Sequence, residues 1–393
     1  MVAFVRARLC GNDQNFWDKI VSSIDCHIVV AGASGVIGAA AVEHFAAMPG
    51  WSVTALSRRR PIVASGRAFA HVAVDLEETD GCAAALDRLP PVTHVVYAAA
   101  REAPGLVRGW TDDTLIAANG RMFANLLDPL AARGGLCHVS LLQGAKAYGA
   151  HRHPVSVPLR EDRPRDEHAN FYWLQEDHLR KRAEQAGFDW TIWRPQVLLG
   201  GVAGAAMNPV AAIGAYAAIC REQGRPFVYP GPGAGLMEMV DAALLAEAFG
   251  WAIDAPGASH QTFNVTNGDV MVLVDAWPGL AASLGLTDQG APPVSLSAFF
   301  AEDTSIAAWA RLAERHGLAV RDLPVLLGQS HCYLDLLLGP RISAKAVPVL
   351  LSTIKLRQAG FAACRDSAAS LTHWLGRMTE LNLLPPLFQR DFA

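Results

Sequence analysis

Apolar and polar residues alternate along the first half of the chain in blocks typical of buried strands followed by helices. Residues 26–48, CHIVVAGASGVIGAAAVEHFAAM, start with an apolar run, pass through a glycine-rich turn and continue with apolar residues at helical spacing. An unbroken apolar run is expected of a strand that helices cover on both faces. The block therefore predicts a strand, a tight turn and a helix, and the next strand follows within residues 51–60.

The same rhythm continues as far as residue 195. Further strands are predicted at 71–76, 92–100, 136–142 and 189–195, and helices around 82–89, 115–132 and 170–187. Strands that alternate with helices imply a parallel sheet with helices on both of its faces. We therefore expect an α/β fold with a doubly wound parallel sheet of the Rossmann type.

Beyond Pro195 the pattern changes to helices. Only two short strand-like pieces interrupt them, at 225–230 and 262–267, and the last third is helical in composition from 298–317 to 370–382. We expect this part to form a mostly helical lid over the carboxyl edge of the sheet. The predicted division is an N-terminal extension at 1–24, a sheet domain at 25–200 with returning segments near 226–267, and a mostly helical region at 201–393.

Composition and charge narrow the class of protein. Apolar residues make up 51% of the 393 and charged residues 18%, so the chain has the means to bury a large core. The net charge is −4 and no basic block occurs, so no nucleic-acid partner is expected. Seven cysteines without a CxxC pair predict reduced thiols in a cytoplasmic protein.

Several other classes have little support in the sequence. The uncharged stretch between Arg194 and Arg221 is long enough to span a bilayer, but glycines and Pro209 interrupt it. We predict a loop and a buried helix there, and no membrane partner. The histidines lack the HExxH spacing and the chain has no G-x-S-x-G, so neither a metal site nor a serine hydrolase is expected.

The turn GASGVIG carries the first chemical signal. It contains Gly32, Gly35 and Gly38. Ser34 lies between the first two glycines, and Val36 and Ile37 lie between the last two. Small residues let the chain turn tightly, admit a diphosphate to the backbone and pack the helix on the strand. The helix N-terminus then favours the negative charge. This context favours dinucleotide binding over an ordinary tight turn, and the GxxGxxG spacing is the one that short-chain dehydrogenases use.

The residues after the second strand bear on the choice of cofactor. Ser57, Arg58 and Arg59 stand where NAD enzymes place an acid for the ribose 2′-hydroxyl. Guanidinium groups match a 2′-phosphate in charge and geometry, so we expect NADPH/NADP+. The alternative is a solvated turn with incidental arginines. Further cofactor contacts are expected at the ends of the next two strands, from Asp75, Leu76, Ala98, Ala99 and Ala100. The alternative is that these residues cap the strand ends or pack in the core.

The usual catalytic spacing of this fold, Tyr-x-x-x-Lys on one helix, is absent. Tyr172 has Glu176 at the fourth position, and Tyr148 has Arg152. Lys146, however, lies just past the strand 136–142, and Tyr172 lies at the start of the next helix. Both positions fall at the carboxyl edge of a doubly wound sheet, so we expect them to meet beside the nicotinamide.

At this point the sequence resembles the progesterone 5β-reductase and iridoid synthase-like group of short-chain dehydrogenases. The resemblance runs from about residue 27 to the C-terminus, in the order GASGVIG, ALSRR, QGAKAY, NFYWLQED, WRPQVLLG, MNPVAAIGAYAAIC, FNVTNGDV and IKLRQAGFAACRDS. It implies that 25–200 is an NADP-binding domain and that 201–393 binds substrate. It also implies that Lys146 and Tyr172 are the catalytic pair and that hydride passes from NADPH to the β-carbon of an α,β-unsaturated carbonyl.

The resemblance further implies roles for the pair and for the pocket. Tyr172 would donate a hydrogen bond to the carbonyl oxygen, and Lys146 would tune the phenol and hold the ribose. The backbone of Pro195 and Val197 would hold the carboxamide. The group's second tyrosine is Trp173 here and its usual threonine is Gln143. We expect the substrate pocket to be lined by Gln143, Tyr148, Trp173, Met207 and Asn208.

Two other functions stay open at this stage. A carbonyl reductase or alcohol dehydrogenase would use the same Tyr172 and Lys146, and a non-catalytic NADP-sensing protein would keep only the glycine turn. The expected partners are small enone or carbonyl compounds, with a homodimer as an open alternative to a monomer.

Overall fold

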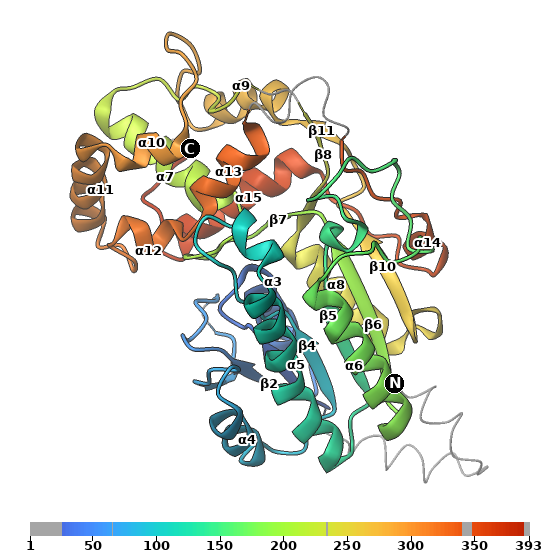
Figure 1. The fold of residues 1–393 in the computed structure, drawn as a ribbon. Helices are drawn as coiled ribbons and strands as arrows, with labels where there is room; N and C mark the ends of the chain where they lie inside the picture. Colours follow the sequence, from blue (N-terminus) through green and yellow to red (C-terminus); the bar gives the residue numbers. More distant parts are fainter. Residues whose placement is uncertain (1–25, 65, 233–234, 340–347, 389–393) are drawn as a thin grey trace.

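The main sheet of the protein has seven parallel strands in the order β10-β6-β5-β4-β1-β2-β3 (Figure 1). The computed structural model describes residues 26–64, 66–232, 235–339 and 348–388, and the extension expected at 1–24 lies outside them. The strands are β1 (Cys26–Ala31), β2 (Trp51–Leu56), β3 (Ala70–Val72), β4 (His94–Tyr97), β5 (His138–Leu142), β6 (Asp189–Pro195) and β10 (Gln261–Val265). The prediction of a doubly wound sheet is confirmed.

The strand order reverses between β1 and β4. From β1 the chain runs outward through β2 and β3, and it then crosses to β4 on the other side. In open α/β sheets ligands bind outside the carboxyl ends of the strands at such a reversal. The glycine turn, residues 32–38, follows β1 at this point.

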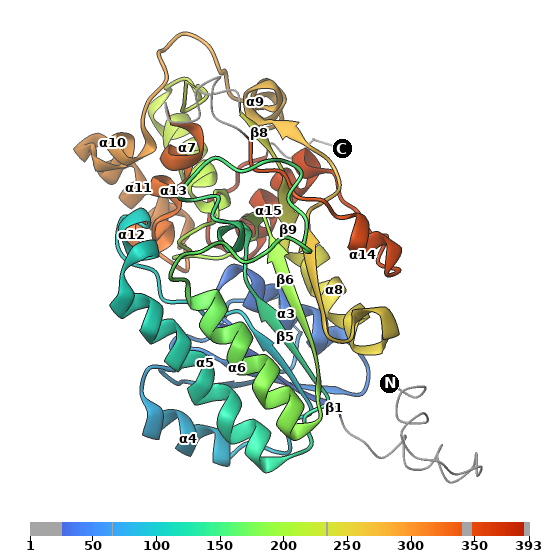
Figure 2. The ribbon, with the colours of Figure 1, turned by 45° about the vertical axis from the view of Figure 1, so that its right-hand side comes forward.

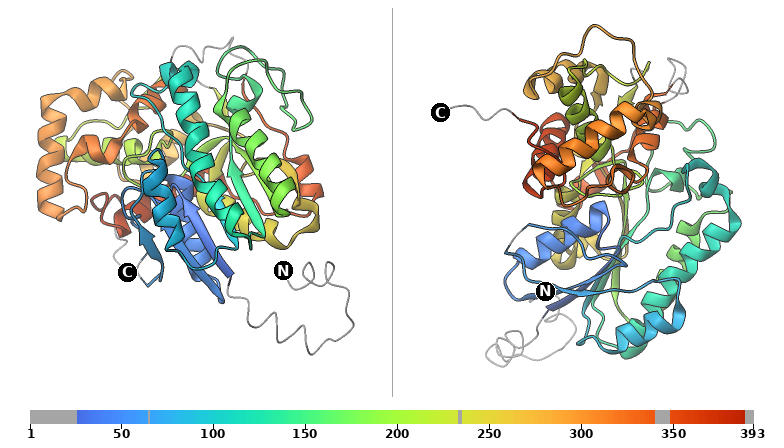
Figure 3. Two further views of the ribbon diagram at one scale, coloured as in Figure 1. Left: turned by 60° about the horizontal axis from the view of Figure 1, so that its bottom comes forward. Right: turned by 90° about the vertical axis from the view of Figure 1, so that its left-hand side faces the viewer.

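Helices cover both faces of the sheet (Figures 2 and 3). One face carries α4 (Thr79–Asp87), α5 (Asp113–Arg133) and α6 (Phe171–Ala186), and the other carries α3 (Val36–Ala47) and α8 (Ala242–Asp254). Every residue of β1 is buried, because Val29 packs toward the first set of helices and Ile28 and Val30 toward the second. Burial on both faces explains why the strand is an unbroken apolar run.

The C-terminal region is helical, as predicted, and packs around α7 (Val210–Gln223). Its other helices are α9 (Leu273–Ser283), α10 (Leu296–Ala301), α11 (Asp303–His316), α12 (Leu323–Leu327), α13 (Ser330–Leu338) and α15 (Ser367–Glu380), and α14 (Ile354–Gln358) lies beside β10. Every α7 residue from Val210 to Cys220 is buried, which accounts for the uncharged stretch. No helix in the described ranges combines the length and the apolar composition that crossing a bilayer requires.

Two small two-stranded sheets form outside the main sheet. They pair β7 (Val197–Leu199) with β9 (Met239–Asp241) and β8 (Leu236–Met237) with β11 (Met271–Val272). The strand expected at 225–230 is not formed: Phe227 is fully buried and its ring stacks on Trp277 at 4.5 Å. Its apolar residues serve the helical core instead of a sheet. The strand expected at 262–267 was correct in type, since β10 forms the edge of the main sheet.

Candidate active site

The glycine turn is packed so closely that side chains have no room. A Cβ on Gly38 would lie 2.2 Å from the carbonyl oxygen of Gly32, and one on Gly32 would lie 2.6 Å from the nitrogen of Ala99. Gly32 also has a φ of +78°, which favours glycine. Gly35 precedes α3, whose start has no side-chain cap and no acid in its first turn. These features fit the diphosphate of a dinucleotide, which a helix N-terminus attracts through its N–H groups and its dipole.

The residues between the glycines have different surroundings. Ile37 is buried in the core beneath α3, and Ser34 and Val36 are half-buried. A Cβ on Gly200 would lie 2.6 Å from Val36 Cγ1, so the segment leading into the helical region packs against the start of α3. The cofactor turn and the lid are therefore in direct contact.

The two arginines predicted to select the cofactor lie exposed at the carboxyl end of β2. The hydroxyl of the buried Ser57 donates to the carbonyl oxygen of Arg59 at 2.6 Å, which fixes the turn that carries both guanidinium groups. A Cβ on Gly204 would lie 3.1 Å from Arg59 Nη2. The Arg59 side chain therefore lies against the loop that leads to α7.

The other predicted cofactor residues lie at neighbouring strand ends. Asp75 accepts a hydrogen bond from the backbone N–H of Glu77 at 3.1 Å, so its carboxylate caps its own turn. The side chain of Leu76 is buried in the core. Ala98 donates to Ala31 at 2.9 Å and lies against Gly32, and Ala99 and Ala100 continue from it along the same edge.

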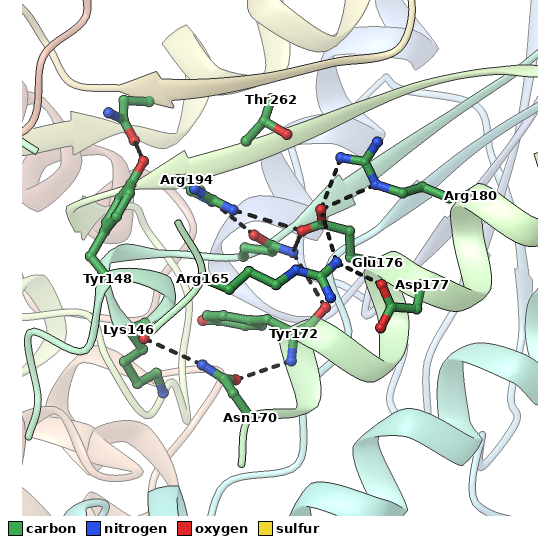
Figure 4. A network of polar contacts seen from close by, with 12 residues as sticks. Lys146, Tyr148, Arg165, Asn170, Tyr172, Glu176, Asp177, Arg180, Arg194 and Thr262 are labelled. Atoms are coloured by element: carbon green, nitrogen blue, oxygen red, sulfur yellow. Dashed lines mark hydrogen bonds and ion pairs between the residues drawn. The ribbon is translucent and has the colours of Figure 1, made fainter. Parts of the chain in front are cut away.

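Lys146 and Tyr172 both lie at the carboxyl edge of the sheet. Lys146 lies in the short helix η2 (Ala145–Tyr148) after β5, and Tyr172 lies in the first turn of α6. The side chain of Asn170 joins them: it accepts from the backbone N–H of Tyr172 at 3.0 Å and donates to the carbonyl oxygen of Lys146 at 3.3 Å (Figure 4). Sequence reasoning did not single out Asn170, although an asparagine directly before a helix signals an N-cap.

The residue Tyr172 is buried, and its hydroxyl is left without a hydrogen bond within the described residues. The residue is 6% exposed, and within the described chain its Oη has no hydrogen-bond partner. A Cβ on Gly144 would lie 3.3 Å from this oxygen, so the glycine leaves space beside it. Burial raises the pKa of Tyr172, the Glu102 carboxylate raises it further, and Arg194 opposes the shift. The phenol is therefore a protonated hydrogen-bond donor at neutral pH.

The ammonium of Lys146 is held by the loop after β4. Its Nζ lies 3.3 Å from Glu102 Oε1 and 4.5 Å from the centre of the Trp110 ring. Burial lowers the pKa of Lys146, and Glu102 opposes this shift. Within the described residues Nζ makes no hydrogen bond to the Tyr172 hydroxyl, so the tuning of tyrosine by lysine stays a prediction.

An ionic network around the buried Glu176 side chain supports the helix that carries Tyr172 (Figure 4). Glu176 accepts hydrogen bonds from Gln143 at 3.0 Å and from Arg180 at 2.9 Å, and Arg165 lies 3.1 Å away. Burial acts to raise the pKa of Glu176, but the hydrogen bonds from Gln143 and Arg180 outweigh it and hold the pKa below its usual value. The carboxylate is thus charged and fully paired.

The same network holds the side chain of Gln143. Its amide nitrogen also approaches the carbonyl oxygen of Tyr172 at 3.4 Å, and its amide oxygen accepts from Arg194 at 2.9 Å. Both ends of the amide have protein partners, so Gln143 supports α6, and its place in the substrate pocket stays a prediction.

Two further pocket residues also turn inward. The Tyr148 hydroxyl donates to Asn264 at 2.6 Å. The fully buried Asn208 donates to the carbonyl oxygen of Gly200 at 2.7 Å and accepts from the N–H of Val210 at 3.2 Å, at the start of α7. Both side chains hold loops together through these polar groups, and their place in the substrate pocket stays a prediction.

The remaining predicted residues keep positions near the edge. Trp173 is half-buried, with the Arg165 guanidinium 4.9 Å from its ring centre, and Met207 is half-buried before α7. Pro195 is buried and its carbonyl oxygen faces Gly144. The side chain of Val197 is buried in the helical core, and its N–H donates to the carbonyl oxygen of Glu238 at 3.3 Å. That N–H already has a protein partner.

A cavity of about 370 Å³ lies between the loop after β4 and α13. Its lining residues are Gly105, Leu106, Val107, Cys332, Asp335, Leu336 and Gly339. Nothing in the sequence pattern indicated it, because the two walls are more than 200 residues apart.

In the described ranges no cluster of histidine, cysteine or acidic residues is arranged to hold a metal ion.

The parallel sheet, the glycine turn and the tyrosine at the carboxyl edge are typical of the short-chain dehydrogenase/reductase fold. The model of the NAD dependent epimerase/dehydratase family matches residues 28–266, and the chain belongs to this family. Solved structures agree in fold. The UDP-glucose 4-epimerase of Thermotoga maritima with UDP-glucose has a TM-score of 0.63 at 14% identity, covering 90% of this chain and 99% of that one. The Thermus thermophilus UDP-glucose 4-epimerase complex with NAD has a TM-score of 0.59 at 19% identity, covering 90% and 98%.

Curated relatives place the chain more narrowly, in the progesterone 5β-reductase and iridoid synthase-like group. The (S)-8-oxocitronellyl enol synthase of Antirrhinum majus is 29% identical over 380 residues, which are 91% of this chain and 92% of that protein. The enol synthase ISY2 of Nepeta cataria is 32% identical, covering 66% of this chain and 68% of that protein. The 3-oxo-Delta(4,5)-steroid 5-beta-reductase of Arabidopsis thaliana is 30% identical, covering 70% and 73%.

Proposed function

We propose that this protein reduces the carbon–carbon double bond of an α,β-unsaturated carbonyl compound with NADPH. The observation that carries the proposal is the protonated hydroxyl of the buried residue Tyr172, for which no hydrogen bond is found within the described chain and which has space beside it at Gly144. A donor of this kind stabilises the negative charge that develops on a carbonyl oxygen during 1,4-reduction. The names of the relatives support the same chemistry, because a 3-oxo-Δ4,5 steroid is a conjugated ketone.

The bound dinucleotide would supply the hydride, and the protein would supply binding and charge. The glycine turn and the start of α3 would hold the diphosphate, and Arg58 and Arg59 would hold the 2′-phosphate of NADPH. Tyr172 would donate its hydrogen bond to the substrate oxygen, and Lys146 would provide the positive charge beside it. Asn170 would fix both, since it bonds to the backbone of each.

Turnover with a panel of enones tests this function. NADPH oxidation is followed with small cyclic enones, 3-oxo-Δ4 steroids and monoterpene dialdehydes, and products are identified by mass spectrometry. We expect a saturated carbonyl product. An allylic alcohol would instead identify a carbonyl reductase, and the absence of turnover with every carbonyl compound would favour an NADP-sensing protein.

The variant Tyr172→Phe tests the tyrosine itself, because it removes only the hydroxyl. We expect kcat to fall by roughly 10²-fold to 10³-fold, the usual effect of losing one oxyanion donor. NADPH affinity, measured by fluorescence titration, should be nearly unchanged. Full turnover of the variant on the best substrate would remove Tyr172 from the mechanism.

A further inference from the structure

One carboxylate beside the catalytic pair has no role in the scheme above. Glu102 lies in the loop after β4, and its side chain is only 10% exposed. One carboxylate oxygen lies 3.3 Å from Lys146 Nζ, and the other accepts the indole N–H of Trp110 at 3.1 Å. The Trp110 ring in turn lies 4.5 Å from Lys146 Nζ. The ammonium, the carboxylate and the indole therefore each contact the other two.

We propose that Glu102 is the positioning residue of Lys146 and that the loop carrying it replaces the missing Tyr-x-x-x-Lys spacing. In that spacing one helix face fixes lysine relative to tyrosine. Here Lys146 and Tyr172 lie on different elements, and the lysine stem has four flexible carbons. A separate anchor is needed, and Glu102 contacts the ammonium itself. This inference rests on the proposed function of the pair.

The loop is fastened on both sides of Glu102. Before it, the fully buried Asn119 of α5 accepts from the N–H of Arg101 at 2.8 Å and donates to its carbonyl oxygen at 3.0 Å. After it, Gln329 donates to the carbonyl oxygen of Ala103 at 3.0 Å and accepts from the N–H of Gly105 at 2.6 Å. Gln329 belongs to the helical region, so the lid contributes directly to the position of the lysine anchor.

The charges around the pair fix the direction of a pH effect. The charged and titratable groups that face Lys146 and Tyr172 are Glu102 after β4, His151 between η2 and α6, and Arg194 on β6, and His168 lies beside His151. Burial lowers the pKa of His151 to about 4, with His168 and Lys146 adding to the shift, so this imidazole is neutral at neutral pH. Glu102 raises the pKa of both Lys146 and Tyr172. Removing its charge should therefore let both groups lose their protons at lower pH.

The variant Glu102→Gln tests the proposal, with Glu222→Gln as the matched control. The Glu222 side chain is 13% exposed and is paired with Arg315 at 2.8 Å, far along the chain in α7. We expect Glu102→Gln to lower kcat about tenfold and to move the alkaline limb of the kcat/KM profile to lower pH. Glu222→Gln should leave the profile unchanged. A wild-type pH profile in Glu102→Gln would overturn the proposal.

A measurement without turnover separates this inference from the proposed function. The chain has five lysines, so reductive ¹³C-methylation gives few NMR signals, and Lys146→Arg identifies the one from Lys146. We expect the Lys146 signal to titrate at lower pH in Glu102→Gln than in the wild type. An unchanged titration overturns the positioning role, whether or not any enone is reduced. Absence of enone turnover in the wild type overturns the function alone.

A second variant keeps the proposal testable if Glu102→Gln does not fold. Trp110→Phe keeps a smaller aromatic ring beside Lys146 and removes the N–H that holds Glu102. We expect a smaller fall in kcat, with NADPH affinity near that of the wild type. A smaller folded fraction with an unchanged kcat per folded molecule would assign Trp110 and Glu102 a structural role only and overturn the proposal.

Discussion

The substitution Gly38→Ala should disrupt cofactor binding through the backbone alone. The added methyl group would lie 2.2 Å from the carbonyl oxygen of Gly32 and 2.7 Å from Ala33 Cα. Both neighbours are main-chain atoms, so no side chain can rotate to make room. To restore ordinary contact, the start of α3 must move away from the end of β1 by about 1 Å.

The size of the effect follows from this displacement. Overpacking a close contact costs about 1–3 kcal/mol, and a contact made only of backbone belongs at the upper end. The moved segment also carries the N–H groups expected to hold the diphosphate. A hydrogen bond to a charged group contributes about 1.5–3 kcal/mol, so losing one should lower NADPH affinity by roughly 10-fold to 10²-fold.

Fluorescence titration of NADPH and urea unfolding measure the two effects. The matched control is Gly279→Ala, another glycine within a helix, because its Cβ would meet nothing within 4 Å. The control should gain about 0.5–1 kcal/mol of stability from the lower entropy of the unfolded chain, with NADPH affinity unchanged. If Gly38→Ala binds NADPH as tightly as the wild type, the turn does not hold the cofactor as argued.

Three further predictions concern the cofactor, the pair and pH. Arg58→Ala should weaken NADPH about tenfold or more and NADH little, since it removes a charge-assisted contact to the 2′-phosphate; equal losses in parallel titrations would contradict this. Asn170→Ala should cost about 1 kcal/mol in urea unfolding through the lost N-cap and should also lower kcat, because Tyr172 loses a backbone tie. Burial raises the pKa of Glu238 to about 7 from 4.5, so the folded chain keeps a proton that the unfolded chain releases. Stability should therefore fall by up to about 3 kcal/mol between pH 4.5 and 7, and Glu238→Gln should flatten that slope in pH-dependent unfolding.

The parts of the fold that were predictable are those fixed by local pattern. The apolar run at Cys26–Ala31 requires burial on both faces, and the glycines at 32, 35 and 38 require close backbone contacts, so strand, turn and helix follow from neighbouring residues. The segment at 225–230 also contains apolar residues typical of a short strand, yet no strand forms there and Phe227 packs onto Trp277, 50 residues later. An apolar pattern indicates that a segment is buried. Whether the segment forms a strand depends on the element it packs against.

The candidate site was predictable only as far as backbone position determines it. Lys146 follows β5 and Tyr172 lies at the start of α6, and in a doubly wound sheet both positions fall at the carboxyl edge whatever their side chains do. The direction of a polar side chain is set instead by partners from other elements. Gln143 turns to Glu176 and Arg194, and the ammonium of Lys146 turns to Glu102, a residue in a loop with no periodicity. Because loops that carry function are held by distant contacts, the anchor of the lysine becomes visible only when the chain is folded.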